Sequence, residues 1–573
     1  MWKIIKSLML SGLLCSMLSQ LLFSAEVLQE GDERFYPVET SSGVVASQEA
    51  LASKAGAEIL QQGGNAVDAA VATGFALAVT LPKAGNLGGG GFMVVWLNKE
   101  KKSIAINYRE KAPLLASSDM YLNEKKEVDR NKISGTYLAS GTPGTVAGLI
   151  LAQKTYGKLS LAQVMAPAIK LAKEGFVMNY PLYLSLLEAK PWLSKSKASM
   201  AIFFKKDGSS YLPGERFKQP QLAWTLERIA KTNGKDFYHG EIAKRLAKDF
   251  KDNGGLITLK DLNSYKAEIV EPVKGNYKGY TVYSMPPPSS GGVILVELLN
   301  ILENFPLKEY GANSAKAIHV MTEAMNYAYN DRNSDLGDPH FIKMDLSELL
   351  SKKYAASIAA KIDPKEHTPA SAISKIKPDD LESNQTTQYS VVDKEGNMVS
   401  NTYTLNYSYG SGISANGLGF LLNNEMDDFT AKVGVANAYG LIQGEANNIA
   451  PGKQPLSSMT PTIVLNKEGE PYFATGSPGG SRIITTTLQV ILNVLEYGYN
   501  LQTAVSLPRV HSQLWPDEIR IEQGISPDTI ELLKKMGHKV SLLPAMGAAE
   551  SVMLKNGHFY GAADPRRSGA LAA

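Results

Sequence analysis

The feature that most constrains this chain is an abrupt change of character at Thr386. Residues 345–385 are rich in Lys, Ser, Ala, Ile and Pro, a composition typical of an exposed and weakly structured segment. Directly after them, residues 389–392 and 398–405 predict two buried strands separated by a turn signal. A loose segment that stops at a threonine opening a buried strand is unusual, and it raises the question of whether the chain is cut between Gln385 and Thr386.

The rest of the chain predicts helices and strands in blocks. From apolar residues at helical spacing, helices are expected over residues 47–62, 65–79, 293–302, 314–330 and 481–495. From alternation or apolar runs, further strands are expected over residues 92–97, 276–283 and 462–465. Residues 145–260 predict mainly helices, and no repeat of fixed period is present. This arrangement predicts an α+β fold in which helices are layered around packed sheets.

The N-terminal residues predict a signal peptide over residues 1–25. Lys3 and Lys6 precede an apolar run over residues 8–22, and the small residues Ser24 and Ala25 follow it. The run is shorter than the roughly 20 apolar residues of a spanning helix, so we expect cleavage and no stable membrane span afterwards. The single cysteine, Cys15, lies inside this segment, and a cysteine-free mature chain excludes disulfides and thiolate catalysis. We therefore expect a periplasmic or secreted bacterial protein.

Charge and motif searches exclude several classes of function. With 59 basic and 56 acidic residues, the net charge of +3 gives no electrostatic footprint for nucleic acid. No two histidines stand four residues apart, as a helical zinc-hydrolase site needs. The run Gly88–Gly91 lacks the Lys-Ser/Thr ending of a phosphate-binding loop. We expect neither a metal nor an organic cofactor.

Thr386 has a specific chemical route to reactivity. A threonine hydroxyl is a poor nucleophile until a base removes its proton. If Thr386 were the first residue of a chain, its own α-amine, which titrates near pH 8, would be that base. Cleavage of the bond between Gln385 and Thr386 would therefore create the catalytic group. Alone, a single threonine is more often an ordinary strand residue.

Several ordered motifs carry a resemblance to a known family. They are residues 384–393 with 402–406, 108–110, 140–144, 424–429, 455–459 and 476–482. On these motifs the chain resembles the γ-glutamyltranspeptidases, a group of N-terminal-nucleophile hydrolases, from about residue 47 to residue 566. The resemblance implies a four-layer α/β/β/α sandwich. It also implies a precursor in which the Thr386 hydroxyl attacks the preceding carbonyl, leaving a large subunit (26–385) and a small one (386–573) as a heterodimer.

The resemblance also assigns roles to individual residues. Thr404 matches the second threonine, which hydrogen-bonds the nucleophile, and Gly479 and Gly480 match the oxyanion-hole glycines. Free N–H groups ahead of the helix expected at 481–495 suit developing negative charge. The substrate-binding residues are expected to be Arg109, Ser457 and Ser458 for the donor α-carboxylate, and Asn406, Glu425 and Asp428 for its α-ammonium. Tyr439 matches the aromatic residue of a lid loop.

The expected reaction is transfer of a γ-glutamyl group from glutathione or related amides to water or to amino-acid or peptide acceptors. One departure is Gln388, where relatives often have histidine; glutamine does not titrate near neutrality, so cleavage rate and pH dependence are expected to differ. Two alternatives stay open. One is an exported amino-acid-binding protein, or inactive relative, that never cuts itself. The other is an acylase of the same fold.

Overall fold

The hairpin of β10 (Thr387–Asp393) and β11 (Met398–Thr404) forms the middle of a central sheet. The computed structural model describes residues 35–374 and 386–573, so the second stretch begins at Thr386. The predictions made for the signal peptide at 1–25, Cys15, Gln385 and the end of the loose segment at 375–385 lie outside these residues. Both strands of this hairpin are buried along their whole length, as the sequence predicts.

Two sheets of seven strands each form the centre of the molecule, and all their neighbouring strands run antiparallel. The first has the order β19-β2-β10-β11-β3-β4-β7, with β2 (Gly43–Ser47), β3 (Gly90–Leu97), β4 (Lys102–Tyr108), β7 (Glu268–Val270) and β19 (Ala570–Ala572). The second has the order β1-β18-β17-β13-β12-β9-β8, with β1 (Val38–Thr40), β8 (Val273–Tyr277), β9 (Tyr280–Ser284), β12 (Thr462–Leu465), β13 (Pro471–Thr475), β17 (Ser551–Lys555) and β18 (His558–Ala562). Smaller sheets join β5 (Phe176–Val177) with β6 (Arg216–Phe217), and β14 (Val510–His511), β15 (Ile519–Glu522) and β16 (Val540–Leu543).

The alternation of side chains along the strands decides which layer each face contacts. In β3, Phe92 and Val94 belong to the apolar cluster between the two sheets, which also holds Ile463 and Val552 from the second sheet. The intervening Met93 belongs to the cluster under the helices. Because successive strand residues point to opposite faces, one apolar strand serves both interfaces.

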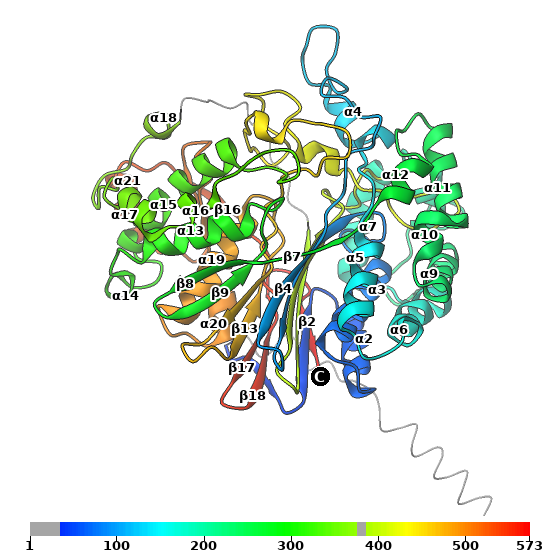
Figure 1. Ribbon diagram of the computed structural model, residues 1–573, viewed down its shortest axis with the longest axis horizontal. Helices are drawn as coiled ribbons and strands as arrows, with labels where there is room; N and C mark the ends of the chain where they lie inside the picture. The colour runs from blue at the N-terminus through cyan, green and yellow to red at the C-terminus, as the bar shows by residue number, and fades with distance from the viewer. Residues whose placement is uncertain (1–34, 375–385) are drawn as a thin grey trace, which may run out of the picture.

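Helices cover the outer face of each sheet (Figure 1). The first sheet is covered by α2 (Ala50–Gln61), α3 (Ala66–Thr80), α5 (Thr145–Tyr156) and α6 (Leu161–Glu174), with α7 (Tyr180–Leu193), α8 (Lys197–Phe203), α9 (Pro220–Thr232), α10 (Lys235–His239), α11 (Glu241–Asp252) and α12 (Leu259–Ser264) around them. The second is covered by α13 (Gly291–Leu302), α15 (Ala315–Asp335), α17 (Lys352–Ala359), α19 (Arg482–Leu495), α20 (Leu501–Ser506) and α21 (Pro527–Lys535). All residues of α3 are buried, which its run of small side chains allows.

This architecture confirms the predicted α+β fold with four α/β/β/α layers. Two details of the prediction are wrong. Residues 276–283 form two strands, β8 and β9, because Lys278 and Gly279 both take positive φ (48° and 92°) and close a tight hairpin. Residues 345–374 are also more regular than predicted, since α16 (Leu346–Leu349), α17 and α18 (Ala370–Ile373) lie within them.

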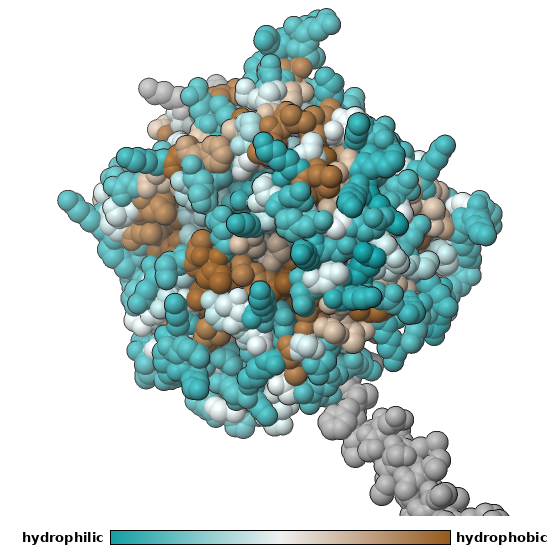
Figure 2. Space-filling view, turned by 45° about the vertical axis from the view of Figure 1, so that its right-hand side comes forward, coloured by the Kyte–Doolittle hydropathy of each residue, from teal (hydrophilic) through white to brown (hydrophobic). Residues whose placement is uncertain are grey.

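The surface seen in Figure 2 is mostly hydrophilic, and its hydrophobic side chains form separate groups between polar ones. Among the described residues, no helix combines the length and the apolar character needed to cross a bilayer.

Candidate active site

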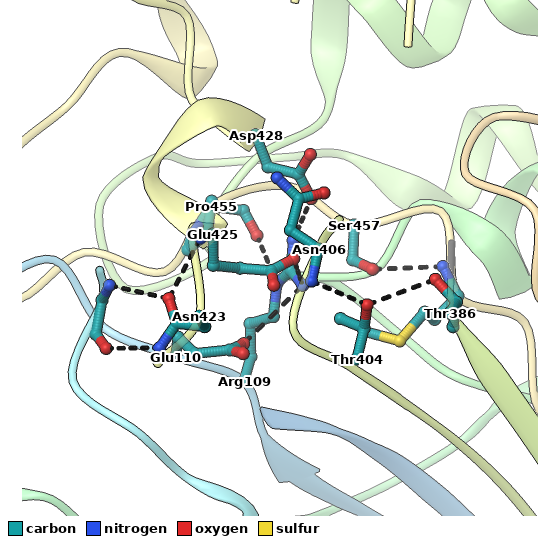
Figure 3. A network of polar contacts seen from close by, with 12 residues as sticks. Arg109, Glu110, Thr386, Thr404, Asn406, Asn423, Glu425, Asp428, Pro455 and Ser457 are labelled. Atoms are coloured by element: carbon teal, nitrogen blue, oxygen red, sulfur yellow. Dashed lines mark hydrogen bonds and ion pairs between the residues drawn. The ribbon is translucent and has the colours of Figure 1, made fainter. Parts of the chain in front are cut away.

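Two threonines from the central hairpin meet at one end of the first sheet. Thr386 stands directly before β10 and Thr404 ends β11, and the register pairs Thr387 with Tyr403. Thr386 Oγ1 donates to Thr404 Oγ1 over 3.3 Å, and the backbone N–H of Asn406 donates to the same Thr404 oxygen over 2.9 Å (Figure 3). Thr386 is 3% exposed. A hydroxyl at the rim of a sheet is thus held in a defined hydrogen-bonded position.

A cavity opens in front of Thr386. It brings together ten of the residues selected from the sequence, together with one buried cation, Arg332, that was not selected. Its lining includes Arg109, Thr386, Thr404, Asn406, Glu425, Asp428, Tyr439, Ser457, Ser458 and Gly480. Gly479 is the neighbour of Gly480 and borders the same turn. The site is therefore assembled from segments more than 350 residues apart in the sequence.

Arg109 lies at the end of β4, fully buried beneath this cavity. Its guanidinium makes ion pairs with Glu425 and Asp428 and donates through Nε to the carbonyl of Pro455 over 3.1 Å (Figure 3). Both carboxylates come from the short 3₁₀ turn η2 (Glu425–Asp428). Arg109, expected to bind the donor α-carboxylate, is thus in direct contact with Glu425 and Asp428, which are expected to bind the donor α-ammonium.

A third carboxylate, which the sequence analysis missed, lies behind this group. Glu110 Oε2 is 3.7 Å from Arg109 Nη1, and its side chain is fully buried. Burial raises the pKa of Glu110 and of Glu425, and the Arg109 charge opposes this only in part. Burial likewise raises the pKa of the neighbouring Asp427 to about 6. The carboxyl oxygens of Glu425 and Asp428 line the cavity and offer acceptors to a cationic group.

Tyr439 covers the cavity from a loop between η2 and β12. Its hydroxyl donates to the Asn406 carbonyl over 2.9 Å and contacts the Asn406 side chain. Asn437 Oδ1 accepts from the N–H groups of Tyr439 and Leu441 and so closes the loop. Tyr439 is only 5% exposed, so it is packed over the site and is not a free surface side chain.

The two serines also line the cavity. The backbone N–H of Met459 donates to Ser457 Oγ over 3.1 Å. The carbonyl of Ser457 accepts from the N–H and the hydroxyl of Ser290, over 2.8 and 2.7 Å. Ser458 Oγ accepts from Arg332 Nη2 over 3.0 Å. Local sequence gives no signal for Arg332, because it lies in the last turn of α15, where basic residues are common.

Gly479 and Gly480 form the turn before α19, as the sequence predicts. Their φ angles are 132° and 58°, and the first of these is open almost only to glycine. A Cβ on Gly480 would lie 2.2 Å from the Tyr439 ring. Neither amide N–H donates to another residue of the described chain. Two free donors at the start of a helix suit an oxyanion.

Gln388 is enclosed by the two sheets. Its Nε2 donates to Ser390 Oγ and Ser400 Oγ, over 3.2 and 3.0 Å, and to the carbonyl of Tyr389. Its Oε1 accepts from the hydroxyl of Thr402 over 2.5 Å. The amide is therefore saturated by strand residues. Its effect on cleavage rate and pH dependence stays a prediction.

One group of side chains outside the cavity has metal-ligand chemistry. His319 and Glu323 stand four residues apart on α15, and His538 follows α21; their ligand atoms lie within 4.8 Å of one another. His319 Nδ1 and His538 Nε2 are 2.7 Å apart, whereas two nitrogens on one tetrahedral zinc are separated by about 3.4 Å. The spacing is that of a hydrogen bond between the rings.

The same cluster connects residues from both sides of Thr386. His367 contacts Glu323 over 2.7 Å and Asp517 over 2.9 Å. These two carboxylates raise the pKa of His367 to about 9 despite its burial. The backbone N–H of Ala370 also donates to Asp517. The last described residues before the junction are thus fixed to the part of the chain that follows it.

Comparisons with known proteins agree with this geometry. The family model for gamma-glutamyltranspeptidase matches residues 52–573. A glutathione hydrolase proenzyme of Escherichia coli (strain K12) is 51% identical over 537 residues, covering 93% of this chain and 92% of the relative. One from Pseudomonas sp. (strain A14) is 47% identical, covering 98% of each chain.

Solved structures show the same relationship. A Helicobacter pylori gamma-glutamyltranspeptidase structure is 42% identical with a TM-score of 0.57, covering 60% of this chain and 97% of that one. A cephalosporin acylase from Bacillus halodurans is 27% identical with a TM-score of 0.82, covering 95% of this chain and 98% of that one.

Proposed function

The chain belongs to the γ-glutamyltranspeptidase family, and from this membership we propose how its own residues carry out the reaction. It is a γ-glutamyltransferase and glutathione hydrolase made as a precursor that cleaves itself. The proposed roles of single residues rest on one observation: the hydroxyl of Thr386 donates to Thr404 at the catalytic cavity. This cavity is lined by acidic side chains and by hydroxyl groups. Water, amino acids or peptides are the proposed acceptors.

Self-cleavage is the first step of the proposal. Thr386 Oγ attacks the carbonyl of Gln385, the bond to the Thr386 nitrogen breaks, and an ester forms. The nitrogen takes the hydroxyl proton as its bond breaks and becomes the free α-amine. Water then hydrolyses the ester, which frees the Thr386 hydroxyl and leaves a carboxylate on Gln385. The products are a large subunit ending at 385 and a small subunit beginning at 386. The α-amine, which titrates near pH 8, is the base that the hydroxyl lacked before.

Transfer repeats the same chemistry on the substrate. The Thr386 amine takes the hydroxyl proton while Oγ attacks the γ-amide carbonyl. The N–H groups of Gly479 and Gly480 stabilise the oxyanion, each by about 3 kcal/mol by analogy with other oxyanion holes. The carbon–nitrogen bond then breaks, the leaving amine takes the proton, and a γ-glutamyl ester remains on Thr386. Thr404 accepts from the Thr386 hydroxyl and thereby fixes its direction.

Recognition of the donor uses both the charged groups and the hydroxyls that line the cavity. Asn406, Glu425 and Asp428 bind the α-ammonium, and Arg109, Ser457 and Ser458 bind the α-carboxylate. A glutaryl donor of an acylase has no ammonium, so it would leave the acidic group without a partner. This favours γ-glutamyl compounds over the acylase alternative. Tyr439 is proposed to close over the bound donor. Export to the periplasm or medium, directed by residues 1–25, is part of the same proposal.

The test compares wild type with Thr386→Ala. We expect wild type to give fragments of roughly 40 and roughly 20 kDa, at ~110 Da per residue, with the smaller one beginning Thr-Thr-Gln-Tyr. Thr386→Ala is expected to stay uncut and to lack activity on a γ-glutamyl anilide. Thr387→Val is the matched control, because the buried Thr387 hydroxyl has no described hydrogen-bond partner. Wild type that remains one intact band on a denaturing gel would instead favour the amino-acid-binding alternative.

A further inference from the structure

Arg332 is a fully buried cation in the wall of the catalytic cavity. It lies in the last turn of α15, is 1% exposed, and lines the same cavity as Thr386 and Ser458. Burial lowers the pKa of its guanidinium to about 10, so the group stays charged at neutral pH. A buried charge is costly unless a partner compensates it.

Within the described chain, the hydrogen bonds of this guanidinium all go to neutral oxygens. Nη2 donates to Ser458 Oγ over 3.0 Å, and Nε donates to Ser290 Oγ over 3.1 Å. Nη1 donates to Gln443 Oε1 and Asn333 Oδ1, over 3.1 and 3.0 Å. No carboxylate of the described chain lies within ion-pair distance of Arg332. The positive charge is therefore hydrogen-bonded to neutral oxygens, and Asp428 compensates it only from beyond ion-pair distance.

Arg109 is in the opposite situation. Two of its nitrogens are occupied by the carboxylates of Glu425 and Asp428, and Glu110 lies behind it. The Arg109 charge is therefore compensated by carboxylates in direct contact with it. Arg332 has no such contact among the described residues, so it is the less compensated of the two cations that line the cavity.

The contact between Arg332 and Ser458 also sets the direction of a donor. Nη2 occupies a lone pair of Ser458 Oγ, so the serine hydroxyl hydrogen remains for a different acceptor. Nε of Arg332 reaches Ser457 indirectly. It donates to Ser290 Oγ, and the Ser290 hydroxyl donates to the carbonyl of Ser457 over 2.7 Å. One side chain thus fixes both serines, the first directly and the second through the backbone.

We propose that Arg332 is a positioning residue of the α-carboxylate subsite, orienting the hydroxyls of Ser457 and Ser458 toward the donor and supplying the positive potential that selects a carboxylate there. This inference rests on the proposed function, since it names a further residue for the same donor. The ammonium of the donor then lies at the Glu425–Asp428 turn, and its carboxylate lies between Arg109 and the two serines. Arg332 does not contact the reacting atoms. It acts through its hydrogen bond to Ser458 and through its positive charge.

The experiment uses two donors that differ at one group. The first is γ-glutamyl-p-nitroanilide, and the second is the same anilide with its α-carboxylate converted to a carboxamide. Arg332→Gln is expected to lower kcat/KM for the carboxylate donor about 10- to 100-fold, the size of one lost hydrogen-bonded charge. Most of this loss is expected in KM. For the carboxamide donor we expect a change of less than about threefold.

The matched control is Arg245→Gln, a half-exposed arginine paired with Glu241 on α11, which is expected to leave both donors unchanged. Arg332→Lys keeps the charge but loses the planar fork, and it is expected to recover part of the carboxylate preference. An equal loss for both donors in Arg332→Gln would mean a purely structural role and would overturn the proposal. An unchanged ratio of kcat/KM between the carboxylate and carboxamide donors would also overturn the proposal.

Folding of each variant is read from self-cleavage and thermal unfolding. If Arg332→Gln does not yield cleaved protein, Arg332→Lys and Ser290→Ala decide the question, with an expected loss of carboxylate preference of about 3- to 10-fold in each. Unchanged preference in both would overturn the inference. Failure of wild type to cleave itself or to hydrolyse the carboxylate donor would instead count against the proposed function.

Discussion

At the scale of single residues, the two buried arginines of the cavity have different electrostatic roles. Arg109 is neutralised by carboxylates of the same turn, whereas Arg332 contacts only hydroxyl and amide oxygens. The residue type is the same, and the difference comes entirely from the neighbours. Gln388 illustrates the same point, because four contacts with strand residues fix its amide.

Glu110 gives a pH-dependent prediction at this scale. Burial raises its pKa above the ordinary value of 4.5, so in the acidic to neutral range the folded protein holds a proton that the unfolded chain releases. The free energy of unfolding contributed by this group therefore falls as pH rises through that range. Glu110→Gln cannot ionise and avoids the loss. We expect its melting temperature, relative to wild type, to increase between about pH 5 and about pH 8.

Calorimetry of both proteins across this range checks the expectation. The exposed Glu468→Gln on the β12–β13 turn is the control, and it should follow wild type at every pH. A difference between Glu110→Gln and wild type that stays constant with pH would contradict the assignment of a protonated carboxyl at this position.

At the scale of elements, the turn before α19 and the Tyr439 loop form one unit. Gly480 has a positive φ and lies directly beneath the Tyr439 ring, while the Tyr439 hydroxyl contacts Asn406 after β11. The carbonyl of Tyr439 also accepts from Gln513 over 3.1 Å. The oxyanion turn, the covering loop and the end of the hairpin therefore constrain one another.

Gly480→Ala tests this coupling. The added Cβ would meet the Tyr439 ring at 2.2 Å, so either the ring or the turn must move. We expect kcat on a γ-glutamyl anilide to fall about 10- to 100-fold, since displaced oxyanion donors are costly. In a Tyr439→Ala background the same substitution should cost much less, because the obstructing ring is gone. A double-mutant cycle in kcat and melting temperature measures this; additive effects would show that the turn and the loop are independent.

At the scale of the whole molecule, the junction at Thr386 does not separate two domains. In the first sheet, β10 and β11 from the second stretch lie between β2 and β3 from the first. In the second sheet, β12, β13, β17 and β18 from the second stretch lie between β1 at one edge and β9 and β8 at the other, all three from the first stretch. Each proposed subunit therefore contributes strands to both sheets, and neither has a complete core of its own.

We accordingly expect the cleaved fragments to stay together until both sheets unfold. Size-exclusion chromatography in native buffer should give one species containing both fragments, and calorimetry should give a single cooperative transition. The uncut Thr386→Ala precursor is the control, and it should unfold at a similar or higher temperature because its unfolded chain stays connected. Release of the small fragment below the transition would contradict the shared-sheet interpretation.

Much of this architecture follows from local sequence. The helices α2, α3, α13 and α19 lie within a few residues of their predicted positions, because apolar spacing and glycine breaks act over one or two turns. The hairpin at 276–283 was missed because its turn residues, Lys278 and Gly279, continue the alternation of the strands. The short helices within 345–374 were missed because their polar composition hides a regular backbone.

The sequence by itself determined the layered class, the threonine at the junction and the inventory of charged side chains in its motifs, because these depend on residue type and short-range spacing. Only the tertiary structure decided how those charges are partnered. The ion pairs of Arg109 with Glu425 and Asp428 and the contact of Arg332 with Ser458 join residues 126 to 319 positions apart. Electrostatic energy depends on distance and on exclusion of water, and both are properties of the packed sheets.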